Sequence, residues 1–192
     1  MKKVILIVLV AMATTSLSAQ RFGIKAGVNF SNYYGDDADG SKTLTGFQLG
    51  GVYEMPLSGN FYLQPEALLT LKGAKSTGDV KIKPFYLEIP VRGMYKLDAG
   101  PGKLTLATGP YLGLGLFGKV TSSGESANLF TKEDGANAAF LKRFDLGLSS
   151  AVGYELASGL FFNVESSLGF LNVSEGSKMK NTTVALVAGF KF

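Results

Sequence analysis

Residues 83–97 read KPFYLEIPVRGMYKL, and this stretch decides the fold. Every second residue is apolar apart from Gly93, and charges of both signs stand between. Such alternation is typical of a β-strand with two unlike faces. Soluble strands usually have ~5–6 residues, whereas a tilted strand that crosses a bilayer needs ~9–11. The stretch therefore indicates a strand between lipid and a filled barrel interior. Its apolar residues are Phe85, Leu87, Ile89, Val91, Tyr95 and Leu97.

The rest of the chain repeats this alternation. Tight turns and longer polar loops alternate between the repeats, which is the pattern of outer-membrane barrels. Because Pro110 cannot donate to a strand ladder, we expect a bulge or local defect there. The sequence predicts an all-β protein, an eight-stranded antiparallel up-and-down transmembrane β-barrel. The expected strands are 22–31, 44–55, 61–73, 83–97, 103–117, 142–156, 160–173 and 181–192.

Aromatic residues of the apolar face gather at the two ends of the expected strands, as in the interfacial girdles of membrane barrels. The polar face is rich in glycine, which a water-facing strand surface disfavours but a narrow barrel interior accommodates. We therefore expect the apolar face to point outward. Alternation alone also fits a soluble β-sandwich or lipocalin-like barrel, so that alternative stays open. The aromatic sets are Phe22, Tyr53, Phe61, Tyr95, Tyr154, Phe162 and Phe192 at the turn end, and Phe30, Phe47, Phe85, Phe144 and Phe170 at the loop end.

Residues 1–19 have the layout of a secretory signal peptide. Lys2 and Lys3 precede an apolar core at 4–13, and a run of small and polar residues follows. The core is shorter than the ~20 residues of a transmembrane helix. We expect cleavage after Ala19, which leaves residues 20–192 as an exported barrel domain in the outer membrane.

The composition excludes several classes of function. The chain has 192 residues with no histidine and no cysteine. Without histidine the usual base of lipases, proteases and acyltransferases is missing, and a transition-metal site is disfavoured. The formal charge of +4 includes Lys2 and Lys3, so the mature chain carries +2, with no basic patch of the kind that binds nucleic acid. We expect neither an enzyme, nor a cofactor, nor a metal site.

Charged residues on the polar face form the best-defined candidate site. They suit either an ion or proton path or a salt-bridged plug, and the narrow interior of eight strands favours the plug. Glu88 and Arg92 lie four residues apart on one strand, so we expect each to pair with a neighbouring strand. The set comprises Lys25, Glu54, Glu66, Lys72, Glu88, Arg92, Lys96, Asp145, Glu155, Glu165 and Lys191.

Two loops are candidates for binding partners. The loop within 32–43 contains GDDADG at 35–40, but it lacks the first aspartate and the final glutamate of a calcium loop, so we expect a solvated acidic loop. The connection 118–141 is the longest, and its Leu129 and Phe130 either dock a ligand or lie on the barrel rim.

The chain resembles the PorT-like outer-membrane β-barrel family of gram-negative envelopes. The resemblance implies the barrel fold, and the family's namesake is associated with a system that secretes proteins across the outer membrane. YLEIP at 86–90 marks the barrel rather than the secretion role. Phe192, with Phe190 and Leu186, is similar to the signal that barrel-assembly machinery recognises. The matching segments are FGIKAGVNFS (22–31), FYLEIPVRGMY (85–95), FDLGLSSAVGYEL (144–156) and VALVAGFKF (184–192).

The sequence thus predicts a monomeric barrel in contact with outer-membrane lipid, with a packed polar lumen. We expect a structural or interaction role in the envelope through the loops 32–43 and 118–141, and the resemblance adds a link to secretion. The alternatives are a narrow transport barrel, for which the lumen glycines leave room, and a soluble exported lipocalin-like binding protein.

Overall fold

A computed structural model describes residues 20–76, 80–122, 125–130 and 141–192. The predicted signal peptide at 1–19 lies outside the described residues. No helix in the described part of the chain is long and apolar enough to cross a membrane. The described residues form ten strands: β1 (Arg21–Tyr34), β2 (Lys42–Ser58), β3 (Phe61–Leu71), β4 (Ala74–Lys75), β5 (Lys81–Ala99), β6 (Gly102–Ser122), β7 (Glu125–Asn128), β8 (Phe144–Leu156), β9 (Leu160–Gly169) and β10 (Lys180–Lys191).

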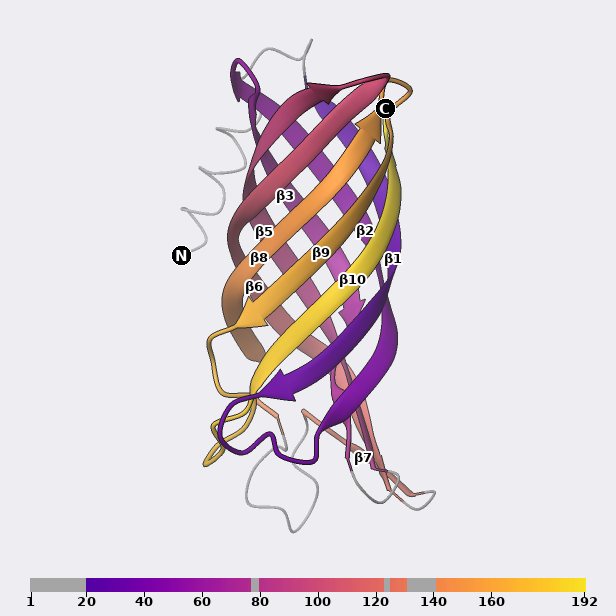
Figure 1. Ribbon diagram of the computed structural model, residues 1–192. Coiled ribbons are helices and arrows are strands. Elements are labelled where there is room, and N and C mark those ends of the chain that lie inside the picture. Colours follow the sequence, from indigo (N-terminus) through magenta and orange to yellow (C-terminus); the bar gives the residue numbers. More distant parts are fainter. Residues whose placement is uncertain (1–19, 77–79, 123–124, 131–140) are drawn as a thin grey trace, which may run out of the picture.

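Eight of these strands close into an antiparallel up-and-down barrel (Figure 1). Neighbours in sequence pair along β1, β2, β3, β5, β6, β8, β9 and β10. The barrel closes because β1 also pairs with β10, from Gly23–Lys191 to Tyr34–Lys180. The two short strands extend hairpins at the loop end, where β4 pairs with β2 and β5, and β7 pairs with β6. The predicted fold class is confirmed.

The strands extend further at the loop end than the sequence predicted. β1 continues to Tyr34, β2 begins at Lys42, and β6 runs to Ser122. In these extensions both faces of the strands are largely polar, so the alternation that marked the strands is lost although the backbone pairing continues. At the β8–β9 side the reverse holds, because β8 begins at Phe144 and β9 ends at Gly169, inside the predicted ranges.

The expected irregularity at Pro110 is a local gap rather than a bulge. The β6–β8 register runs unbroken through the pair of Pro110 with Leu148. On the other side, the β5–β6 ladder skips the positions opposite Gly109 and Pro110 without changing register. The bulge of this strand pair lies at Phe85/Tyr86 instead.

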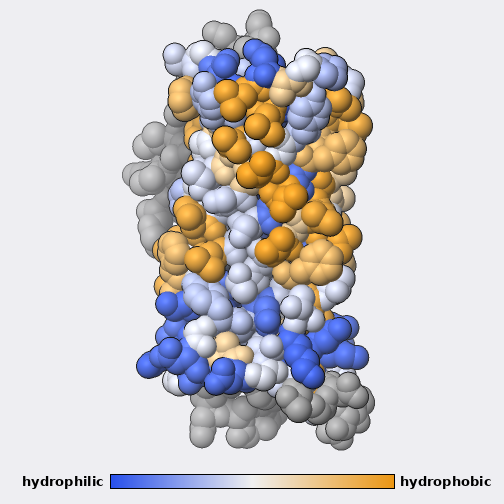
Figure 2. All heavy atoms as spheres, in the orientation of Figure 1, coloured by the Kyte–Doolittle hydropathy of each residue, from blue (hydrophilic) through white to orange (hydrophobic). Residues whose placement is uncertain are grey.

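The apolar face of the barrel points outward. Figure 2 shows a hydrophobic band around the visible face, with hydrophilic residues gathered at the loop end. Outward aromatic rings contact one another across strands, with centroids 4.5 Å apart for Phe22 and Tyr53 at the turn end, and 4.7 Å apart for Phe85 and Phe117 at the loop end. A soluble lipocalin-like barrel needs its apolar face inside, so this arrangement contradicts the soluble alternative.

Candidate functional site

The barrel lumen holds the charged residues of the polar face in three tiers along its axis. Apart from Lys72, which directly follows β3, each charged side chain stands at an inward position of its strand, and none of these residues is more than 5% exposed. We call them the turn-end tier (Glu54, Lys96, Glu155, Lys191), the middle tier (Lys25, Glu66, Arg92, Glu165) and the loop-end tier (Lys72, Glu88, Asp145).

The turn-end tier joins four strands across the lumen. Lys96 on β5 contacts Glu54 on β2 at 2.7 Å and Glu155 on β8 at 2.9 Å. Lys191 on β10 contacts the same two carboxylates at 2.5 Å and 2.8 Å. Arg21, which is partly exposed at the end of the barrel, adds a further contact to Glu155. Because each lysine bridges both carboxylates, the four charges form a closed ring.

The middle tier repeats this ring with no net charge. Lys25 contacts Glu66 at 2.6 Å and Glu165 at 2.7 Å. Arg92 contacts the same two carboxylates at 2.8 Å and 3.3 Å. Buried carboxylate and ammonium groups need hydrogen bonds beyond their ion pairs to offset the free energy of desolvation. Further amide donors are Gln48 and Asn163 to Glu165, at 3.1 Å and 3.2 Å, and Gln64 to Glu66, at 2.5 Å.

The loop-end tier has one cation for two carboxylates. Lys72 contacts Glu88 and lies 3.5 Å from Asp145. Its ammonium group also lies 4.5 Å from the ring centroid of Tyr111, within cation–π range. Asp145 accepts hydrogen bonds of 2.9 Å from both the Tyr111 hydroxyl and the Asn181 amide. Glu88 and Arg92, four residues apart on β5, do not pair with each other. Glu88 contacts Lys72 just beyond β3, and Arg92 contacts Glu66 on β3 and Glu165 on β9.

Leu129 and Phe130 fold back into the barrel instead of lying on its rim. Both are buried, and the Phe130 ring meets the Tyr86 ring edge-on at 5.9 Å. Arg143 holds Phe130 in place, because its guanidinium donates to the Phe130 carbonyl at 3.1 Å and to the Gly115 carbonyl at 2.9 Å. We call this cluster the mouth plug; it comprises Tyr33, Ala74, Tyr86, Leu129, Phe130, Leu141 and Val173. No pattern in the sequence distinguished it from an exposed loop.

The lumen glycines leave less room than the sequence suggested. A Cβ atom on Gly115 would lie 2.5 Å from Phe130 Cζ, and one on Gly147 would lie 2.6 Å from the Tyr111 ring. Gly189 faces the Phe161 ring in the same way. These glycines therefore mark the places where inward aromatic rings pack against the wall, so they do not line an open path.

The outward apolar band and the closed ring of strands are those of a membrane barrel. Residues 15–175 match the family model described as outer membrane protein beta-barrel domain. The chain belongs to this family. The crystal structure of Neisserial surface protein A (NspA) covers 89% of this outer-membrane barrel and 97% of its own chain, with a TM-score of 0.53 and 13% identity, which shows a shared fold. Ail of Yersinia pestis covers 90% and 98%, with a TM-score of 0.49 and 18% identity. No curated protein sequence matches the chain.

The acidic loop of this outer-membrane barrel is tied to a neighbouring loop. Asp36 contacts the Lys178 ammonium at 2.9 Å, and Asp37 accepts from the Lys178 backbone amide at 2.8 Å. Within the described ranges, no group of three aspartate, glutamate, histidine or cysteine side chains could hold a metal ion.

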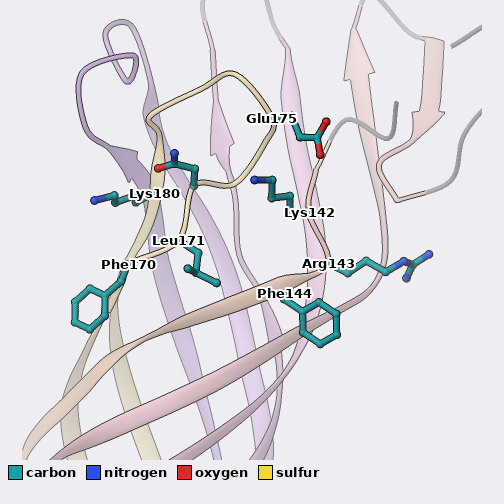
Figure 3. Close-up of a pocket in the computed structure, with 8 residues that line it drawn as sticks. Lys142, Arg143, Phe144, Phe170, Leu171, Glu175 and Lys180 are labelled. Atoms are coloured by element: carbon teal, nitrogen blue, oxygen red, sulfur yellow. The ribbon is translucent and has the colours of Figure 1, made fainter. Parts of the chain in front are cut away.

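A groove on the loop-end surface lies between the start of β8 and the β9–β10 connection (Figure 3). Its lining includes Phe144, Phe170 and Lys180, while Arg143 points away toward β6, where it binds the Gly115 and Leu116 carbonyls. Phe144 and Phe170 belong to the outward aromatic set, so part of the groove lining is continuous with the apolar belt.

Phe192 closes the last strand at the turn end. It is 70% exposed, its ring lies 5.5 Å from that of Phe190, and its backbone amide donates to the Phe22 carbonyl at 2.7 Å. The aromatic side chain thus faces outward at the barrel seam, where β1 and β10 pair.

Gly115→Leu is expected to lower the free energy of unfolding by about 1–3 kcal/mol, because the added side chain enters the space of the Phe130 ring. The double variant Gly115→Leu/Phe130→Ala should be more stable than Gly115→Leu alone, since it removes the clashing ring. Urea unfolding of barrel refolded in lipid vesicles measures both. Gly93→Leu is the control, because a Cβ there meets only the Thr108 carbonyl, at 3.8 Å. A double variant no more stable than the single one would contradict this packing.

Proposed function

We propose that this protein is a non-enzymatic, non-conducting structural barrel of the outer membrane that presents its loops to other envelope components. The filled lumen carries this proposal. Two closed rings of ion pairs, the loop-end tier and the mouth plug follow one another along the axis. An ion would have to break buried pairs at each tier, and breaking such a pair costs about 3–5 kcal/mol. The aromatic rings packed against Gly115, Gly147 and Gly189 argue against the alternative of a narrow transport barrel, which needs open space beside the lumen glycines.

The loop end is the proposed surface for partners. Among the described residues of the loops 32–43 and 118–141, the acidic segment at 36–39 is largely exposed, whereas Leu129 and Phe130 are occupied in the mouth plug. The resemblance to the PorT-like family supports protein-secretion components as partners. We propose protein components of the envelope as the partners, and no nucleic acid, because the exposed segment at 36–39 is acidic.

A monomeric state and assembly by the barrel-assembly machinery complete the proposal. Each of the eight barrel strands has two hydrogen-bonded neighbours, so the barrel itself presents no strand edge for a second copy. The exposed Phe192 ring at the seam supports its proposed role as the assembly signal.

Planar-bilayer recording tests the sealed lumen. Wild-type barrel should insert without any step in ionic current. The charge-neutral variant Lys25→Ala/Glu66→Ala/Arg92→Ala/Glu165→Ala should conduct more than wild type, because it removes a complete ring. A matched variant that shortens outward side chains, Leu112→Ala/Leu186→Ala, should stay silent. Reproducible current steps from wild-type protein would overturn the proposal in favour of a transport barrel.

A further inference from the structure

The strand register at the loop end places lysines directly opposite one another. Lys42 pairs with Lys75, Lys75 pairs with Lys81, and Lys83 pairs with Lys119. Like charges directly opposite in an antiparallel pair destabilise a sheet. Among the described residues, none of these five lysines has an ion pair, whereas Lys103 and Lys178 do. We call Lys42, Lys75, Lys81, Lys83 and Lys119 the lysine ladder.

Four of the five lysines, Lys75, Lys81, Lys83 and Lys119, face outward, whereas Lys42 stands on β2 two residues before the buried Leu44 and shares its side of the alternation. On β5, Lys81 and Lys83 share the face of the outward Phe85, and the alternate residue Ile82 packs against the mouth plug. On β4, Ala74 belongs to the mouth plug, so the next residue, Lys75, points away from the lumen. The four outward lysines therefore form one basic surface across β4, β5 and β6, and Lys42 lies at its edge, opposite Lys75.

The lysine ladder lies next to the aromatic belt, on the side of the loop end. The rings of Phe47, Phe85 and Phe117 form a row across β2, β5 and β6, with centroids 5.9 Å and 4.7 Å apart. Since a strand rises ~3.3 Å per residue and the strands of membrane barrels tilt by about 35–45°, Lys83 and Lys81 lie roughly 5 and 10 Å beyond Phe85 along the barrel axis. The headgroup region of a bilayer extends about 5–8 Å beyond each side of the hydrocarbon core. The ladder thus begins at the level of lipid phosphates.

We propose that the lysine ladder binds the phosphate groups of anionic lipids in the leaflet that surrounds the loop end. The aromatic row below it and the outward Leu114 and Leu116, which are 37% and 39% exposed, would contact the acyl chains of the same lipids. Each ammonium group offers three donors and can serve two phosphates at once. A negatively charged phosphate between two opposed lysines would also offset the repulsion between their ammonium groups. This surface is independent of the sealed lumen and of any protein partner.

Lipid enrichment tests this inference on the full mature chain. The protein is placed in nanodiscs of phosphatidylcholine mixed with phosphatidylglycerol, and the lipids retained after detergent extraction are measured by mass spectrometry. Wild type should retain phosphatidylglycerol selectively. Lys83→Gln/Lys119→Gln should bind it roughly ten- to thirtyfold more weakly, and high salt should reduce the difference. Lys103→Gln/Lys178→Gln, which loses the same charge elsewhere, should behave as wild type.

Thermal unfolding supplies a second readout. In pure phosphatidylcholine, Lys83→Gln/Lys119→Gln should be at least as stable as wild type, because a repulsive pair is gone. Adding phosphatidylglycerol should raise the Tm of wild type more than that of this variant. Equal lipid retention and equal Tm shifts in all three proteins would overturn the proposal. Selective protection of wild type by soluble inositol hexakisphosphate, matching that by phosphatidylglycerol, would assign the ladder to a soluble polyanion and likewise overturn it.

Discussion

Arg92→Met is expected to lower the free energy of unfolding by about 3–5 kcal/mol, because it removes one partner of a buried ionic ring. Arg92 is fully buried and contacts both Glu66 and Glu165. Without its guanidinium, Lys25 alone would face the two carboxylates, and the middle tier would carry an uncompensated negative charge inside the barrel. Urea titration in lipid vesicles, followed by the heat-dependent mobility of the barrel on SDS gels, measures the loss.

Restoring the charge balance separates electrostatics from packing. Arg92→Met/Glu66→Gln leaves Lys25 opposite Glu165 alone, so the middle tier is again neutral and should recover part of the lost stability. Lys103→Met serves as a surface control, because the one ion pair of Lys103 among the described residues is with the exposed Asp98. If Arg92→Met were no less stable than Lys103→Met, the middle tier would not be the stabilising ring inferred here.

Leu186→Arg is expected to lower the free energy of unfolding by about 2–4 kcal/mol when the barrel is folded in a bilayer. Leu186 is 55% exposed near the middle of β10, between Val28 of β1 and Val164 of β9. An arginine there would place its charge in the hydrocarbon region. The measurement is urea unfolding in phospholipid vesicles.

Thr182→Arg provides the matched control for this prediction. Thr182 stands on the same face of β10 as Leu186, four residues nearer the loop end. A charge near the interface costs about 0–1 kcal/mol, so this variant should be close to wild type. Equal losses for the two arginines would show that the outward face of β10 does not cross a lipid core.

Much of the fold could be predicted from local pattern. The alternation at 83–97 identified β5 and both of its faces, because successive side chains of a strand point to opposite sides. The same rule located the eight barrel strands and the outward aromatic sets. The rule did not predict the extensions of the strands at the loop end. There, outside the apolar belt, the lysine ladder and the short strands β4 and β7 have no alternating apolar face to mark them.

The sequence by itself determined which residues share a face, because that depends only on the two-residue period, and the glycines and aromatic residues indicated which face meets lipid. Tertiary structure alone decided which charges meet. Lys25 and Glu165 lie 140 residues apart in the chain, yet barrel closure brings them to 2.7 Å. The mouth plug depends likewise on a connection folding back onto Tyr86. Register and closure are set by all strands together, so no local pattern contains them.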